Sequence, residues 1–261
     1  MVASKHPSRD VTVVAHRGFA GVAPENTLTA ARRAGRLGAD IVECDVVPTA
    51  DGTPVVFHDR RLDGHGSSRG ITDATGAVDE RSTETVTSAH VLDTAQQIPT
   101  FASFVDAVPD GVGVNVELKH PRPGSSEGDP DATPYRDLWE PLVQQVLDAL
   151  DRHPAKVLFS SFSESALATV RSSAPSALIA PIAWDLDTAI KMADRLETAI
   201  VHPSIDGLRT ADCESLSAYT VNAWTARRWQ DARDAVQHGA DGVIADYPYL
   251  LETVLDRTDG P

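Results

Sequence analysis

The sequence predicts one α/β domain, a TIM (β/α)8 barrel with a loop-rich insertion after its second strand. Short apolar, β-rich runs alternate with helical patterns from one end of the chain to the other, which indicates parallel strands joined by crossover helices. Eight such units favour a closed barrel over an open sheet. The length of 261 residues agrees, because a single barrel of this class takes about 250 residues.

The predicted strands are short apolar runs bounded by polar or turn-forming residues. They comprise residues 11–15, 40–46, 54–58, 112–118, 156–159, 178–183, 199–202, 218–223 and 241–245. The run at 54–58 follows directly on the turn Ala-Asp-Gly-Thr at 50–53. The other eight runs are the candidates for barrel strands.

The predicted helices fall between most of these strands. They comprise residues 27–37, 101–108, 138–152, 164–172, 187–196, 227–238 and 249–255. In the first, apolar residues recur near helical spacing, and Gly38 follows as a C-terminal glycine. Residues 60–97 are polar and show little periodicity, so we expect them to form the loop-rich insertion. We also expect an irregular connection between residues 203 and 217.

The charge of the chain is strongly negative. It has 38 acidic and 23 basic residues, a formal net charge of -15, and only four of the basic residues are lysines. Such a surface repels nucleic acid and anionic membranes, and no run approaches the ~20 apolar residues of a membrane span. We expect salt adaptation, since high salt screens self-repulsion; the alternative is an ordinary acidic protein from a high-GC genome.

The sequence also predicts a cytoplasmic protein. Two cysteines, Cys44 and Cys213, cannot form a disulfide framework. The opening residues Met-Val-Ala-Ser-Lys-His-Pro-Ser-Arg-Asp-Val lack the apolar region of a secretory signal. We expect Cys44, within a predicted strand, to pack between the barrel and its helices.

Polar or aromatic side chains stand at or just after the ends of predicted strands, where barrel enzymes place their chemistry. They are His16 and Arg17, Glu43 and Asp45, Glu117 and Lys119, and Trp224. Gly18 follows the first pair and allows a tight turn there.

The spacing of the acidic residues predicts a metal site. Residues two apart on a strand share a face, so Glu43 and Asp45 point the same way and Cys44 points the other way. Their repulsion is relieved if a cation lies between them. With Glu117 from the neighbouring strand, three hard oxygen donors converge, a set that suits Ca2+ or Mg2+ rather than Zn2+.

Two histidines and two cations complete a hydrolytic site. His16 and His58 are candidates for a general acid and a general base near neutral pH. Arg17 and Lys119 offer positive charge to a phosphoryl oxygen. Together with a cation they indicate hydrolysis of a phosphate ester. Lys119 has an alternative role, to neutralise Glu117.

Other residues have plainer readings. Trp224 is expected either to line the substrate pocket or to pack in the core. His202 ends a predicted strand, so it is a further candidate for a residue that lines the pocket. Asn26 and Asp59 are expected to support the site or form turns rather than to bind the metal directly.

The ordered motifs of the chain resemble those of the glycerophosphodiester phosphodiesterase family. They are His-Arg-Gly at 16–18, Pro-Glu-Asn-Thr at 24–27, Glu-Cys-Asp at 43–45, Asp-Gly-Thr-Pro-Val-Val-Phe-His-Asp at 51–59, Ile-Pro-Thr at 98–100, Glu-Leu-Lys at 117–119, Trp-Thr at 224–225 and Ala-Asp-Gly-Val-Ile-Ala-Asp-Tyr-Pro at 240–248. The resemblance covers nearly the whole chain. It implies a TIM barrel that binds one divalent ion, commonly Ca2+ or Mg2+.

The resemblance also implies a role for each candidate residue. Glu43, Asp45 and Glu117 would be the metal ligands, and His16 and His58 the acid–base pair. Phosphate binding would fall to Arg17 and Lys119, and Trp224 would wall the pocket beside the glycerol end. The expected reaction is hydrolysis of a glycerophosphodiester to an alcohol and glycerol phosphate.

Two other functions remain alternatives. One is a related barrel phospholipase, of the lysophospholipase D or C type, that acts on lysolipids. The other is a non-catalytic barrel that binds a phosphorylated ligand. The choice of metal, the alcohol, the division of acid and base roles and the oligomeric state do not follow from the sequence.

Overall fold

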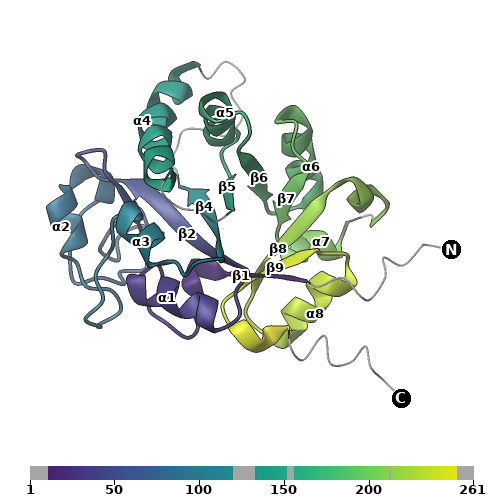
Figure 1. The fold of residues 1–261 in the computed structure, drawn as a ribbon, viewed down its shortest axis with the longest axis horizontal. Coiled ribbons are helices and arrows are strands. Elements are labelled where there is room, and N and C mark those ends of the chain that lie inside the picture. Colours follow the sequence, from purple (N-terminus) through teal and green to yellow (C-terminus); the bar gives the residue numbers. More distant parts are fainter. Residues whose placement is uncertain (1–10, 120–132, 152–155, 212, 252–261) are drawn as a thin grey trace.

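Eight parallel strands close into a barrel in the computed structural model, which describes residues 11–119, 133–151, 156–211 and 213–251 (Figure 1). The strands are β1 (Thr12–Ala15), β2 (Ile41–Pro48), β4 (Gly113–Leu118), β5 (Val157–Ser161), β6 (Leu178–Ala183), β7 (Ile200–Pro203), β8 (Thr220–Ala226) and β9 (Gly242–Ala245). The ring closes because β1 pairs with both β2 and β9. A short strand, β3 (Pro54–Val56), runs antiparallel to the end of β2. The predicted TIM barrel is confirmed.

Helices surround the barrel on its outside (Figure 1). They are α1 (Leu28–Arg36), α2 (Thr83–Thr87), α3 (Phe101–Ala107), α4 (Thr133–Leu150), α5 (Glu164–Ser173), α6 (Leu186–Arg195), α7 (Ile205–Arg209) and α8 (Trp229–Gln237). Six begin at a Ser, Thr or Asp whose side chain accepts a backbone N–H of the first turn: Thr27, Ser82, Thr100, Ser163, Asp185 and Ser204. Such caps satisfy N–H groups that a helix start otherwise leaves unpaired.

Strand β2 separates a packed outer face from a polar inner one. Val42, Cys44 and Val46 are buried in the main hydrophobic cluster, together with residues of α1, α3, α4 and α5. Glu43 and Asp45 alternate with them and point into the barrel, because successive side chains lie on opposite faces of a strand. The expected position of Cys44 between strands and helices is confirmed.

The insertion contains more regular structure than expected. Residues 60–97 include a 3-10 turn, Val78–Glu80, and helix α2, beside α3 and the far end of β2 (Figure 1). A separate apolar cluster anchors it: Val47, Val55, Phe57, Leu62, Val78, Val86, Ala89, Val91 and Ile98. Helix α2 has five residues, of which only Val86 is buried, so it has no apolar repeat that periodicity could detect.

The structure differs from the expected elements at three further places. The connection after β7 is not irregular throughout, because it contains α7 and a 3-10 helix, Cys213–Ala218. Strand β8 continues to Ala226, so Trp224 lies within the strand instead of after it. The predicted helix 249–255 begins as a 3-10 turn, Pro248–Leu250, and its remainder extends beyond the described residues.

None of the described helices is both long enough and apolar enough to cross a membrane.

Candidate active site

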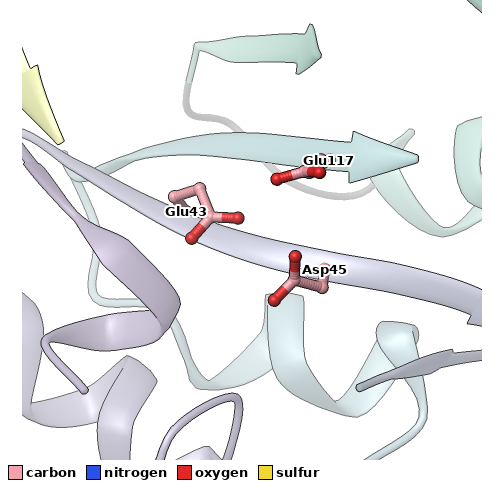
Figure 2. Close-up of side chains that lie close together, drawn as sticks. All are labelled: Glu43, Asp45 and Glu117. Atoms are coloured by element: carbon pink, nitrogen blue, oxygen red, sulfur yellow. The ribbon is translucent and has the colours of Figure 1, made fainter. Parts of the chain in front are cut away.

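Three buried carboxylates converge inside the barrel on β2 and β4. Glu43 and Asp45 come from β2 and Glu117 comes from β4, with one ligand oxygen of each lying within 4.8 Å of the others (Figure 2). The strand register places Asp45 beside Glu117, and the two-residue period points Glu43 the same way as Asp45. The three predicted metal ligands therefore lie together.

Burial and repulsion distribute the charge of these carboxylates unevenly. Burial, reinforced by Asp45 and Glu117, raises the pKa of Glu43 well above its usual range. Burial also acts to raise the pKa of Asp45, but Lys119 and Arg17 outweigh it and hold that pKa well below its usual range. Within the described chain, Glu43 Oε1 has no hydrogen-bond partner. A buried, partly unpaired set of carboxylate oxygens fits a hard divalent cation.

Lys119 follows β4 directly, and its ammonium group contacts two of these carboxylates. Its Nζ lies 3.1 Å from Asp45 Oδ1 and forms a closer ion pair with Glu117. Burial acts to lower the pKa of Lys119, but the two carboxylates, Asp45 first, raise it above its ordinary value. The lysine is therefore charged beside the cluster, which is compatible with neutralising Glu117 and with binding phosphate.

Arg17 contacts the same carboxylates through its backbone and its side chain. Its backbone N–H donates to Glu43 Oε2 at 2.7 Å, and its φ of 51° belongs to the tight turn that follows β1. Its Nη1 donates to Glu25 Oε1 at 2.9 Å, and its Nε lies 3.2 Å from Asp45 Oδ2. The guanidinium group is thus fixed beside the predicted metal ligands.

Asn26 holds Asp45 from the other side. Its Nδ2 donates to Asp45 Oδ2 at 2.8 Å, and the backbone N–H of Asp45 donates to Asn26 Oδ1 at 3.3 Å. The backbone N–H of Asn26 also donates to the carbonyl of Arg17 at 3.0 Å. These contacts agree with one of the two roles expected for Asn26, support of the site, and its φ of 57° agrees with the other, formation of a turn.

His16 follows β1 and is oriented by a carboxylate from the neighbouring strand. Its Nδ1 lies 2.6 Å from Asp246 Oδ1, directly after β9, and both side chains are largely buried. Burial acts to raise the pKa of Asp246, but the hydrogen bond from His16 outweighs it and lowers that pKa. Because an ionised carboxylate only accepts hydrogen bonds, this contact favours a proton on Nδ1 of His16 and leaves Nε2 as the ring nitrogen that faces other partners.

His58 follows β3 and has an equivalent partner in the next residue. Its Nδ1 lies 2.7 Å from Asp59 Oδ1, and the His58 side chain is 31% exposed whereas that of His16 is 13% exposed. Burial acts to raise the pKa of Asp59, but hydrogen bonds from His58 and the Arg69 backbone lower it to about 2. Asp59 therefore contacts His58, which agrees with the first of the two roles expected for it, support of the site or formation of a turn.

Trp224 belongs to an aromatic cluster at the carboxyl ends of three strands. Its ring centroid lies 5.5 Å from that of Phe162, after β5, and 4.8 Å from that of Trp184, after β6. Trp184 is 70% exposed. The cluster therefore presents aromatic surface to solvent at the end of the barrel to which these strands run.

His202 lies inside the barrel and is hydrogen-bonded to Trp224. It is fully buried, and burial lowers its pKa to about 3, so it is neutral. Its ring contacts Asn222 at 3.0 Å, and its carbonyl accepts the Trp224 indole N–H at 2.8 Å. His202 therefore contacts, through its backbone carbonyl, Trp224, which is predicted to bind substrate.

Sequence reasoning assigned no role to Asp246, Glu25 or Arg69. Asp246 comes directly after β9. It therefore meets the same criterion as the other candidates, a polar side chain at the end of a barrel strand. Glu25 lies in a loop but belongs to the motif Pro-Glu-Asn-Thr at 24–27, which was a signal for it. Arg69 lies in a loop outside every quoted motif, and only its contacts connect it to the site.

The chain matches the model of the Glycerophosphoryl diester phosphodiesterase family over residues 16–250. The chain belongs to this family. A relative named glycerophosphodiester phosphodiesterase, from Caldanaerobacter subterraneus subsp. tengcongensis, is 28% identical over 249 residues, covering 94% of this chain and 98% of its own. YqiK of Bacillus subtilis is 31% identical over 256 residues, with coverage of 93% and 98%.

Solved structures agree with the family assignment. A phosphodiesterase from Oleispira antarctica, in complex with the product sn-glycerol-3-phosphate, has a TM-score of 0.78 at 26% identity and covers 94% of this chain and 96% of its own. A glycerophosphodiester phosphodiesterase from Agrobacterium tumefaciens has the same fold, with a TM-score of 0.71 at 21% identity and coverage of 92% and 99%. As a member of this phosphodiesterase family, the chain is a phosphoric diester hydrolase.

Proposed function

We propose that the chain hydrolyses glycerophosphodiesters to an alcohol and glycerol phosphate, with His16 and His58 as the acid–base pair. One observation carries the proposal: the chain neighbour of each histidine is hydrogen-bonded to a predicted metal ligand. The Arg17 backbone N–H donates to Glu43 Oε2 at 2.7 Å, and the Phe57 backbone N–H donates to the Asp45 carbonyl at 2.9 Å. The two histidines follow different strands, β1 and β3, that both adjoin β2. Each also has its Nδ1 held by a carboxylate, Asp246 or Asp59.

We assign one divalent cation, Ca2+ or Mg2+, to Glu43, Asp45 and Glu117. The donors are hard oxygens, which these two ions prefer, and the unpartnered Glu43 oxygen supports the assignment. Such a cation, when bound, supplies positive charge to phosphoryl oxygens and lowers the pKa of a bound hydroxyl or water.

The side chains divide the remaining work. One histidine removes the proton of the nucleophile, a glycerol hydroxyl or a water, and the other donates a proton to the departing alkoxide. Arg17 and Lys119 stabilise negative charge on the phosphoryl oxygens. Both cations are already fixed by carboxylates, so they lose little freedom when substrate binds.

Trp224 is proposed to line the substrate pocket. Its indole N–H donates to the carbonyl of His202, so its ring can interact with a substrate only through apolar contact. The exposed Trp184 beside it favours a second candidate function, hydrolysis of lysophospholipids, because an apolar surface can contact an acyl chain. The polar insertion and the net charge of -15 favour water-soluble diesters instead.

We further propose a cytoplasmic location and adaptation to salt. The small number of cysteines supports the first and the net charge of -15 supports the second. If activity is highest in dilute buffer, the chain is an ordinary acidic protein and the proposal of salt adaptation fails.

The test is a divalent-ion screen with glycerophosphocholine and lysophosphatidylcholine, at low and high salt. His16→Ala and His58→Ala are each expected to lower kcat by about 100- to 10,000-fold, the usual contribution of a general acid or base. His90→Ala is the matched control, because the exposed His90 is also held at Nδ1 by a carboxylate, Asp73, within the insertion. Near-normal activity of both site variants would refute the mechanism.

The same assay separates the alternatives. Hydrolysis of lysophosphatidylcholine that exceeds that of glycerophosphocholine, and that Trp184→Ala lowers selectively, would support the second candidate function. Absence of turnover of both diesters under every metal tested would refute the proposed substrates.

A further inference from the structure

Arg69 of the insertion contacts two carboxylates that belong to the barrel end. Its Nη1 and Nη2 donate to the two oxygens of Glu25 at 2.8 and 2.7 Å. Its backbone N–H donates to Asp59 Oδ2 at 2.8 Å, and its Nε lies 3.1 Å from each Asp59 oxygen. One guanidinium group therefore links Glu25 and Asp59.

Each of these carboxylates also holds a residue of the proposed site. Glu25 Oε1 accepts from Arg17 Nη1 at 2.9 Å, and Asp59 Oδ1 lies 2.7 Å from His58 Nδ1. Glu25 and Asp59 are both buried, so they have few alternative partners in solvent. The position of each carboxylate therefore determines the position of Arg17 or His58.

We propose that Arg69 is a positioning residue that sets the geometry of His58 and Arg17 together. The inference rests on the proposed function, in which His58 transfers a proton and Arg17 binds phosphate. Arg69 acts through Asp59 and Glu25. A planar guanidinium group suits this task because its donors form a rigid fork that matches the two oxygens of a carboxylate.

The charges of the group are consistent with this role. Burial acts to raise the pKa of Glu25, but hydrogen bonding from Arg69 and the charge of Arg17 lower it. The pKa of Asp59 is likewise lowered despite burial. Both carboxylates are therefore ionised at neutral pH and keep accepting hydrogen bonds from the residues they orient.

Anchoring the insertion does not require Arg69. The apolar cluster of the insertion includes Val47 on β2 and Val55 on β3, so burial of hydrophobic surface attaches the insertion to the barrel. The side chain of Arg69 instead contacts Glu25 and Asp59, which in turn contact Arg17 and His58. Its contacts therefore fit the positioning of site residues rather than the attachment of the insertion.

The test compares Arg69→Gln with Arg61→Gln. Arg61 is the matched control because it lies in the same insertion, is similarly exposed (32% against 38%) and makes a two-pronged ion pair, with Asp63. Arg69→Gln is expected to lower kcat/KM about 10- to 100-fold, the usual loss when a partner that orients an active-site residue is removed. Arg61→Gln is expected to stay close to the wild type.

The division of the effect between kcat and KM identifies its cause. Loosening His58 lowers kcat and loosening Arg17 raises KM, so both should change in Arg69→Gln at an unaltered folded fraction. Guanidinium chloride at non-denaturing millimolar concentration should restore part of the activity of Arg69→Ala, whereas sodium chloride at equal ionic strength should not. The proposal would be overturned if Arg69→Gln had an unchanged KM and a lowered Tm and if guanidinium chloride did not restore activity to Arg69→Ala. Arg69 would then only stabilise the fold.

Failure of this inference differs from failure of the proposed function. If His58→Ala is inactive while Arg69→Gln matches Arg61→Gln, only the role of Arg69 is wrong. If His58→Ala retains activity, the proposed mechanism is wrong and the role of Arg69 falls with it.

Discussion

Asp246→Asn tests the electrostatic support of His16; it also removes the ion pair of Asp246 with Arg227, whose side chain is largely exposed. The substitution keeps the shape of the side chain but removes the charge that lies 2.6 Å from His16 Nδ1. The backbone of residue 246 is unaffected, since its N–H donates to Ala226 and its carbonyl accepts from Gly21. The fold should therefore persist while the histidine loses its ionic partner.

The size of the effect follows from the bond that is lost. A hydrogen bond to a charged group contributes about 1.5–3 kcal/mol, and ~1.4 kcal/mol corresponds to a tenfold change in rate. If that energy is used in proton transfer, kcat falls about 10- to 150-fold. An amide can also donate to Nδ1, which stabilises the wrong tautomer and increases the loss.

The assay is steady-state hydrolysis of glycerophosphocholine, with Tm measured on the same samples. Asp73→Asn is the control, because Asp73 holds the exposed His90 at 2.9 Å in the same way but has no proposed role in the reaction. Both variants should fold, and only Asp246→Asn should lose kcat. A wild-type kcat in Asp246→Asn, or a loss that merely parallels a fall in Tm, would refute the reasoning.

Three further predictions concern stability. Ca2+ or Mg2+ at about a hundred times its Kd should raise the free energy of unfolding by about 2.7 kcal/mol. Glu43→Gln should abolish this gain without destabilising the metal-free protein, because burial and neighbouring carboxylates already disfavour the Glu43 charge. Gly18→Ala should lose more than the ~1 kcal/mol of backbone strain alone, because a Cβ there would lie 2.6 Å from the Ala30 Cβ at a φ of 75°. The stability advantage of the wild type over Asp59→Asn should shrink as the pH falls from about 4 to 2, since folding lowers the Asp59 pKa from 3.8 to about 2.

Each of these predictions has its own control. Metal stabilisation that persists in Glu43→Gln would remove Glu43 from the ligand set. Gly38→Ala introduces the same strain at a φ of 84° with no atom within 4 Å, so an equal loss in both glycine variants would exclude the clash. For Asp59, chemical denaturation across the pH range is compared with Asp110→Asn, an exposed position; parallel curves would contradict the lowered pKa.

The strands and the convergence of the predicted metal ligands could be read from the sequence because both depend on local order. An apolar run forms a buried strand, and its two-residue period places Glu43 and Asp45 on one face, independent of how the rest of the chain packs. Glu117 required one further assumption, that consecutive βα units place their strands side by side, and β2 does pair with β4. Helix α2 was missed because five residues with one buried side chain carry no period.

Two of the supporting contacts join segments that are distant in the chain. Asp246 meets His16 across 230 positions because the barrel closes between β9 and β1. Arg69 meets Glu25 across 44 positions because the insertion folds back over the end of the barrel. A charged residue in a polar loop looks the same in sequence whether it faces solvent or a buried carboxylate. Its partner is chosen by the packing of the elements around it. The positions of the predicted metal ligands therefore follow from local periodicity, whereas the contact of His16 with Asp246 follows from closure of the barrel and the contacts of Arg69 follow from packing of the insertion.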